Sequence, residues 1–157
     1  MRRKLIIWLF EKSEKIYTAF KKKKKWDVTR KELLTYPIET LGFQLGAFLT
    51  KNNFELIPKV ERHDAYHVLT GYGTEVQDEI ALQYLCFGNG KRSLYLFGVI
   101  AIGTILLPEY LSYYIKSYTL GKNCNPFHQF EYLHLLNYSL EELRCIIFSK
   151  TQLKNHF

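Results

Sequence analysis

The sequence predicts an all-α protein, a single-domain helical bundle with a basic amphipathic helix at its N-terminus. The chain has 157 residues, 47% of them apolar, which is enough for one ordinary core. Apolar residues recur mainly every three or four positions, as on one face of a helix. Several segments also begin with residues that start helices. The three cysteines include no C-x-x-C pair, which argues against a disulfide framework and indicates a reducing compartment.

Charge divides the chain into two parts, a basic arm over residues 1–31 and a helical domain over residues 32–157. The whole chain carries a formal charge of +7, and the arm alone has 12 Lys and Arg against 3 acidic residues. A nucleic-acid-binding face is disfavoured, because its basic residues would spread over the folded surface. The apolar run at residues 5–10 is too short for a signal peptide.

The arm is predicted to lie on a membrane surface. Trp8 and other apolar residues recur near helical spacing, and a run of lysines follows. The predicted membrane-contacting residues are Trp8, Lys21, Lys22, Lys23, Lys24 and Lys25. Such a helix binds an anionic leaflet through its apolar face and its lysines. The alternative is a helix docked on the core, followed by a solvated lysine loop.

The uncharged segment at residues 94–107 is too short to span a bilayer. It predicts a buried core helix or a partly inserted segment. Membrane contact is therefore expected to be peripheral, on the inner, cytoplasmic face of a membrane. In a eukaryote that membrane would be the mitochondrial inner membrane.

Helix boundaries follow from caps and breakers. Pro37 stands where a first helical residue would, and the apolar pattern after it ends at residues 52–53. Gly42 and Gly46 share a face of this helix, which allows close approach of another helix or an apolar ligand. Pro108 should bend or restart a helix that Gly121 ends.

Four residues between positions 63 and 79 form a candidate metal site. His63 and His67 are i and i+4 on one face of a predicted helix, and Asp64 lies on the same side. Glycines at 71 and 73 break that helix, and Thr74 is predicted to cap the next one. This returning helix can bring Glu79 against the histidines. Asp64 and Glu79 are the candidate catalytic acid or base groups.

Two imidazoles and two carboxylates suit a divalent cation, Zn²⁺ first, with Fe²⁺ or Mn²⁺ as alternatives. Four protein ligands would leave a tetrahedral cation without an open position, so catalysis requires a higher coordination number or a carboxylate acting as acid or base. The alternative is that a histidine is an ordinary core residue and the acids are solvated.

The string HDAYH at residues 63–67, followed by eleven residues and Glu79, resembles the HD-x-x-H-x11-E signature of the ubiquinone (coenzyme Q) biosynthesis protein four family. The segments around Pro37 and Thr70, and Arg144 in its closing helix, are similar to other family features. The resemblance covers roughly residues 36–148.

The resemblance implies an α-helical protein at a membrane periphery, with His63, Asp64, His67 and Glu79 as metal ligands. It implies ubiquinone biosynthesis by metal-dependent oxidative decarboxylation at ring C1 of a prenylated hydroxybenzoate. Partners would be a polyprenylated aromatic lipid, the membrane and other quinone-biosynthesis proteins. We place the isoprenoid tail at Gly42, Gly46, Gly98 and Ile102.

Two other functions remain open from the sequence. One is a non-catalytic lipid-binding scaffold that organises quinone-biosynthesis enzymes, with the metal joining two helices. The other is a membrane-surface adaptor without metal. The tyrosine-rich stretch at residues 110–118 also suggests a homodimer.

Overall fold

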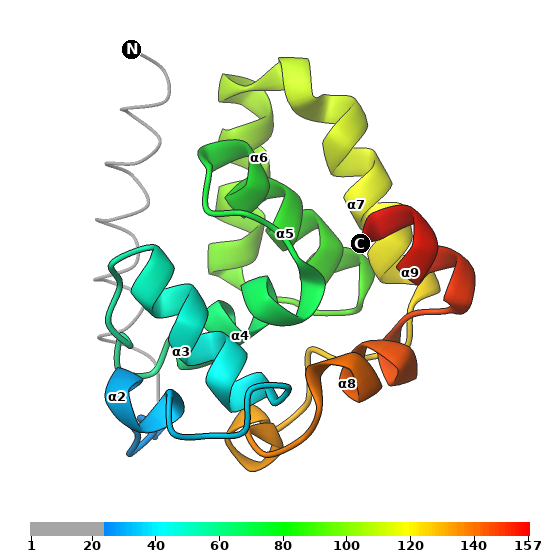
Figure 1. Ribbon diagram of the computed structural model, residues 1–157. Coiled ribbons are helices and arrows are strands. Elements are labelled where there is room, and N and C mark those ends of the chain that lie inside the picture. The colour runs from blue at the N-terminus through cyan, green and yellow to red at the C-terminus, as the bar shows by residue number, and fades with distance from the viewer. Residues whose placement is uncertain (1–23) are drawn as a thin grey trace. The chain divides into compact units, whose positions relative to one another are not determined.

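A computed structural model describes residues 24–157 (Figure 1). These residues form helices joined by short connections, and no β-strand occurs among them; Thr40 and Ser139 make one isolated β-bridge. The all-α prediction is confirmed. Trp8 and Lys21 to Lys23, predicted to contact a membrane, lie outside the described residues, whereas Lys24 and Lys25 are described and exposed.

The helical elements run in chain order as α2 (Arg30–Leu33), α3 (Leu41–Lys51), α4 (Glu61–Thr70), α5 (Val76–Gly88), α6 (Leu94–Leu106), the 3₁₀ turn η1 (Pro108–Tyr110), α7 (Leu111–Asn123), the 3₁₀ turn η2 (Tyr132–Leu135), α8 (Leu140–Ile147) and α9 (Lys150–His156). The described residues form two compact units. One is 72–128, and the other combines 24–71 with 129–157.

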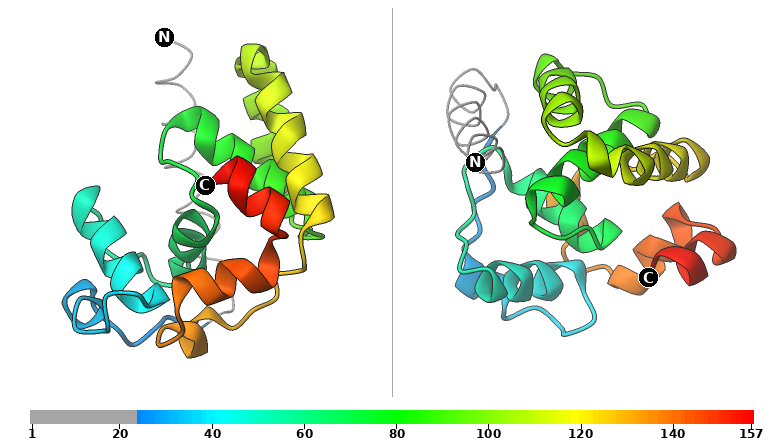
Figure 2. Two further views of the ribbon diagram at one scale, coloured as in Figure 1. Left: turned by 45° about the vertical axis from the view of Figure 1, so that its right-hand side comes forward. Right: turned by 90° about the horizontal axis from the view of Figure 1, so that it is seen from above.

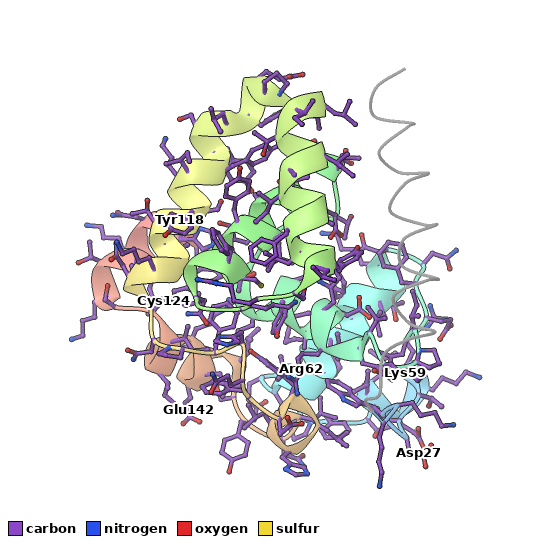
Figure 3. The ribbon with its side chains drawn as sticks, turned by 180° about the vertical axis from the view of Figure 1, so that it is seen from behind. Asp27, Lys59, Arg62, Tyr118, Cys124 and Glu142 are labelled. Carbon is purple, nitrogen blue, oxygen red and sulfur yellow. The ribbon has the colours of Figure 1, made fainter. Side chains whose placement is uncertain are left out.

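Within residues 72–128, α5 packs closely on α7 (Figure 2). A Cβ atom at Gly88 would lie 2.2 Å from the carbonyl oxygen of Tyr118, a residue labelled on α7 in Figure 3. A Cβ at Gly121 would lie 2.0 Å from the carbonyl oxygen of Leu85. Both contacts are with backbone, so the two helices approach at a distance that only glycine permits.

Asn89, just after α5, ties that helix to the segment following α7. Its buried side-chain amide donates to the carbonyls of Gly121 and Asn125, at 3.2 and 3.1 Å. Its side-chain oxygen accepts from the backbone N–H groups of Phe127 and His128, at 2.9 and 3.2 Å. The Asn89 side chain thus forms hydrogen bonds with four backbone groups. Backbone N–H and C=O groups in a loop are rarely buried without such hydrogen-bond partners.

Helix α6 has a continuous exposed apolar face. We call it the α6 stripe; its members are the exposed Leu94, Phe97, Ala101, Ile102 and Ile105 and the half-buried Gly98. They recur at the three- and four-residue spacing of one helix face. Leu94 is 92% exposed and Ile105 77%, and only three of the thirteen α6 residues are buried. Of the two predicted alternatives, the buried core helix is therefore wrong, and the partly inserted segment stays a prediction.

Pro108 redirects the chain after α6. The helices before and after it are bent by 103°, as predicted for a proline that restarts a helix. Between residues 24 and 157, no individual helix has both the length and the apolarity to cross a bilayer. The bent pair 94–106 and 108–123 meets that test jointly.

In the other unit, the two glycines of α3 allow close packing. A Cβ at Gly42 would lie 2.9 Å from the Leu136 carbonyl oxygen and from the Tyr36 ring, and one at Gly46 would lie 3.0 Å from the Leu33 Cβ. The protein's own atoms therefore fill the space beside both glycines, where the sequence also allowed an apolar ligand.

Three helix ends differ from expectation. Helix α3 begins at Leu41 rather than Pro37, because the bridge to Ser139 keeps Thr40 extended and Thr40 caps the helix instead. Helix α5 begins at Val76 with Glu75, not Thr74, as the capping residue. Helix α7 continues through Gly121 to Asn123, because that glycine serves the contact with α5.

Candidate metal centre

The centre of the site is a histidine pair on α4. His63 and His67 are one turn apart, and their Nε2 atoms lie 3.4 Å from each other. Their rings meet edge to face, with centroids 4.8 Å apart. The predicted convergence of the two imidazoles is therefore what the structure shows, and each directs a ring nitrogen to one point.

Phe48 of α3 orients the second histidine. His67 is only 3% exposed and stacks on the Phe48 ring, with centroids 5.5 Å apart and an interplanar angle of 16°. Phe54 in turn packs edge to face on Phe48. Stacking restricts the rotation of the imidazole, so the ring nitrogens of His67 keep a fixed direction. This role of Phe48 was not predictable from the sequence, because the contact joins two helices.

Glu79 is the third member of the group. It lies in the first turn of α5, and one potential ligand atom from each of His63, His67 and Glu79 lies within 4.8 Å of the others. These three form the group that the described residues bring together; Asp64 is not among them. The donor set is two nitrogens and one oxygen.

The turn between α4 and α5 requires its glycines. Gly71 ends α4 with φ of 74°, a left-handed conformation that side chains disfavour. A Cβ at Gly73 would lie 2.5 Å from the Asp78 carboxylate. That carboxylate also accepts a hydrogen bond of 3.0 Å from the Tyr113 hydroxyl. Burial raises the pKa of Tyr113, so this hydroxyl remains a donor. The first turn of α5, which carries Glu79, is thereby fixed.

The start of α4 is fixed as well. Glu61, the first residue of the helix, is 3% exposed, and its carboxylate accepts a hydrogen bond of 2.9 Å from the backbone N–H of Trp26. Arg62 donates to Glu131 at 2.7 Å. A carboxylate in the first turn also interacts favourably with the helix dipole.

The histidine pair has the spacing that a divalent cation requires. Two metal–nitrogen bonds of about 2.0–2.1 Å at a tetrahedral angle place their nitrogens about 3.4 Å apart, and the Nε2 atoms of His63 and His67 have that separation. Imidazole and carboxylate are both ligands of Zn²⁺, Fe²⁺ and Mn²⁺. Three protein ligands leave a tetrahedral cation one open position.

The remaining predicted site residues lie elsewhere. Gly42 and Gly46 are buried in packing within α3's own unit. Gly98 and Ile102 belong to the α6 stripe, and a Cβ at Gly98 would meet no atom within 4 Å. The lipid role of these four glycine and isoleucine positions stays a prediction.

These features define a class of helical protein that carries two histidines and one carboxylate on consecutive helices, as a group that could hold a metal ion. The pattern of the family described as Coenzyme Q (ubiquinone) biosynthesis protein Coq4 matches residues 58–148, more than half of the chain. The chain belongs to this family. The family resemblance predicted from the sequence is confirmed, and with it a role in ubiquinone biosynthesis.

A solved structure has a similar fold. It is the crystal structure of a protein from Nostoc punctiforme PCC 73102 assigned by its name to ubiquinone biosynthesis. The likeness has a TM-score of 0.65 and covers 92% of this chain and 79% of that one, at 18% sequence identity. Identity at this level shows the shared fold alone. No curated protein sequence matches the chain significantly.

Proposed function

We propose that this protein binds one divalent cation, Zn²⁺ first, and acts in oxidative decarboxylation at ring C1 of a prenylated hydroxybenzoate at a membrane surface. The observation that carries the proposal is the three-donor group, His63, His67 and Glu79, with its 3.4 Å separation between imidazole nitrogens. A catalytic zinc site has three protein ligands and an open position. A bound cation supplies Lewis acidity toward a substrate carboxylate.

The roles of the residues follow from their positions. His63 and His67 hold the cation, and Phe48 keeps the His67 ring in place. Glu79 supplies the oxygen ligand. Asp64 is adjacent to His63 in sequence but outside the donor group, so we assign it the acid or base role that a ligand could not fill. Exchanging the ring carboxyl group for a hydroxyl whose oxygen comes from water releases CO₂, two protons and two electrons, and in the proposed reaction dioxygen takes up these protons and electrons to give hydrogen peroxide.

The α6 stripe supports the lipid and membrane parts of the proposal. Its thirteen-residue helix has no charged side chain, and it includes the exposed Ile102 and the half-buried Gly98. An exposed apolar face of this kind marks a site for lipid or protein. We propose that the isoprenoid tail or lipid acyl chains contact it. The proposed location is the inner, cytoplasmic face of a membrane, or the mitochondrial inner membrane in a eukaryote.

The first test is elemental analysis of protein purified without chelator or affinity-tag metal. We expect about one Zn²⁺ per chain in the wild type, and its loss in His63→Ala and Glu79→Ala, because each removes one of three donors. Lys116→Ala, an exposed change on α7, is the control. No metal in the wild type, even after reconstitution with Zn²⁺, Mn²⁺ or anaerobic Fe²⁺, contradicts the metal proposal.

A second assay separates enzyme from scaffold. Substrate carrying ¹³C in its carboxylate should release labelled CO₂ in the presence of dioxygen, with the rate reduced in Asp64→Asn although metal is retained. The alternative function is a lipid-binding scaffold, favoured by the exposed α6 stripe. Metal binding without CO₂ release, together with lipid binding, would support the scaffold instead.

A further inference from the structure

The C-terminal end of the ligand helix α4 has an unusual degree of external support. The last four carbonyls of any α-helix lack partners within the helix. In α4 the first of them, on His67, accepts from the Gly71 N–H at 2.8 Å. The Val68 and Leu69 carbonyls accept from Arg144, through Nη2 at 2.7 Å and Nε at 3.0 Å.

The fourth carbonyl is occupied as well. Thr70 accepts a hydrogen bond of 2.6 Å from Nε2 of His156, at the end of α9. A carbonyl oxygen only accepts, so this nitrogen carries the proton. All four terminal carbonyls of α4 therefore have donors, and three of the four bonds come from side chains of α8 and α9.

Arg144 provides charge and shape together. Its guanidinium donates two bonds from one edge, a fork that lysine cannot reproduce. Burial lowers the pKa of Arg144 from its usual value, yet an arginine remains protonated at neutral pH. A positive charge at a helix C-terminus opposes the partial negative charge of the unpaired carbonyls.

Phe157 closes this arrangement over the end of the helix. The centroid of its ring lies 4.0 Å from the guanidinium carbon of Arg144. The same ring contacts Gly71, where a Cβ would lie 2.9 Å from Phe157 Cε1. Phe148 packs edge to face on Phe157, with centroids 5.6 Å apart. The guanidinium is thus held between the helix end and an aromatic face.

We propose that Arg144 and His156 are positioning residues for the metal centre. By filling the carbonyls of the last turn of α4, they fix the turn that carries His67, and metal affinity depends on them. This inference rests on the metal-binding part of the proposed function. Neither residue has a ligand role in it, and His156 carried no predicted role.

The test measures Zn²⁺ affinity of the full chain by competition with a chromophoric chelator. The variants are Arg144→Lys, which keeps charge but loses the fork, and His156→Phe, which keeps a ring but loses the donor. We expect each to weaken Zn²⁺ binding by about tenfold or more, the usual range for residues that orient ligands. His156→Gln, which restores an N–H donor, should recover most of the affinity. Lys154→Ala, an exposed change on α9, is the control.

If Arg144 and His156 only capped the helix, their substitution would change the folding stability and leave the metal geometry unchanged. Two further measurements separate these effects. Circular dichroism of the metal-free variants establishes that each is folded at the temperature of the titration. The visible spectrum of the Co²⁺ form reports ligand geometry. We expect its bands to shift in Arg144→Lys and in His156→Phe, and to lie close to their wild-type positions in His156→Gln.

The outcomes are distinguishable. If the wild type binds Zn²⁺ and the folded variants bind it within twofold of wild type, the positioning proposal is overturned while the proposed metal function stands. If the wild type itself binds no divalent cation, both are overturned. Weaker Zn²⁺ binding in Arg144→Lys and His156→Phe, with recovery in His156→Gln, supports both the positioning proposal and the metal function.

Discussion

At the scale of single residues, the site depends on neighbours that sequence spacing does not reveal. The i, i+4 spacing predicted the pairing of His63 and His67, because both lie on one turn of one helix. The stacking of Phe48 and the bonds from His156 join positions far apart in the chain. Only the folded structure brings such partners together, so the histidine pair was predictable and its supports were not.

Phe48→Ala tests the aromatic support. The change removes the ring stacked on His67 and frees the imidazole to rotate, so we expect Zn²⁺ affinity to fall by about tenfold while Phe54→Ala changes it less. Competition titration measures both. An affinity equal to wild type in folded Phe48→Ala would show that burial alone orients His67.

Protonation of His156 should make the metal-free protein sensitive to mild acid. Burial lowers the pKa of His156 below its usual 6.5, the nearby Arg144 charge adds to this, and the bond to Thr70 opposes it. As pH falls through 6.5, the unfolded chain therefore takes up a proton before the folded chain does, and folding stability decreases.

Urea unfolding with chelator present, at pH 7 and pH 5, measures this effect. We expect the wild type to lose more stability over this interval than His156→Gln, which has no titrating group at the position. Parallel losses in the two proteins would contradict a neutral His156 in the folded state.

At the scale of helices, caps were predictable where only local chemistry decides. Thr29 and Glu32, with the three-residue spacing of a capping box, form one at the start of α2, and Ser139 caps α8. The start of α3 was not predictable, because the pairing of Thr40 with Ser139 is a long-range contact. Gly121 was read as a helix end, although it serves a crossing of two helices. A glycine permits either structure, and the sequence does not show which neighbour requires it.

The glycines of the helices give a matched pair of substitutions. Gly121→Ala places a Cβ against the Leu85 carbonyl and should destabilise the protein by about 3 kcal/mol, the cost of overpacking against a backbone that moves little. Gly98→Ala meets no atom within 4 Å and should stabilise α6 by up to about 1 kcal/mol. Urea unfolding of both variants measures the difference. Equal midpoints would contradict the close approach of α5 and α7.

At the scale of the whole molecule, the family and the all-α class followed from the sequence, whereas the exposure of α6 did not. An uncharged segment of this length fits a core helix equally well, since hydropathy does not show which residues a neighbour covers. The structure leaves Leu94 and Ile105 exposed, which is costly in water unless lipid or a partner covers them.

Vesicle co-sedimentation tests how the molecule meets a membrane. Ile105→Asp introduces a negative charge into the α6 stripe. It should reduce binding of the full chain to vesicles containing anionic lipid, because moving a carboxylate from water into apolar surroundings costs free energy. Ser112→Asp, an exposed change on α7, adds the same charge outside the stripe and should have a smaller effect. Equal binding by both variants would exclude the stripe from the membrane contact.

The short spacing of the three donors has a consequence for the order of folding. Glu79 lies only twelve residues after His67, and His67 only four after His63. Closing so small a loop costs little chain entropy, and local contacts form early. Under the proposed function, a nascent chain would therefore be able to bind the cation before residues 144 and 156 have emerged from the ribosome. Arg144 and His156 would then tighten an ion already in place, so metal loading would begin during synthesis and finish with the packing of the last two helices.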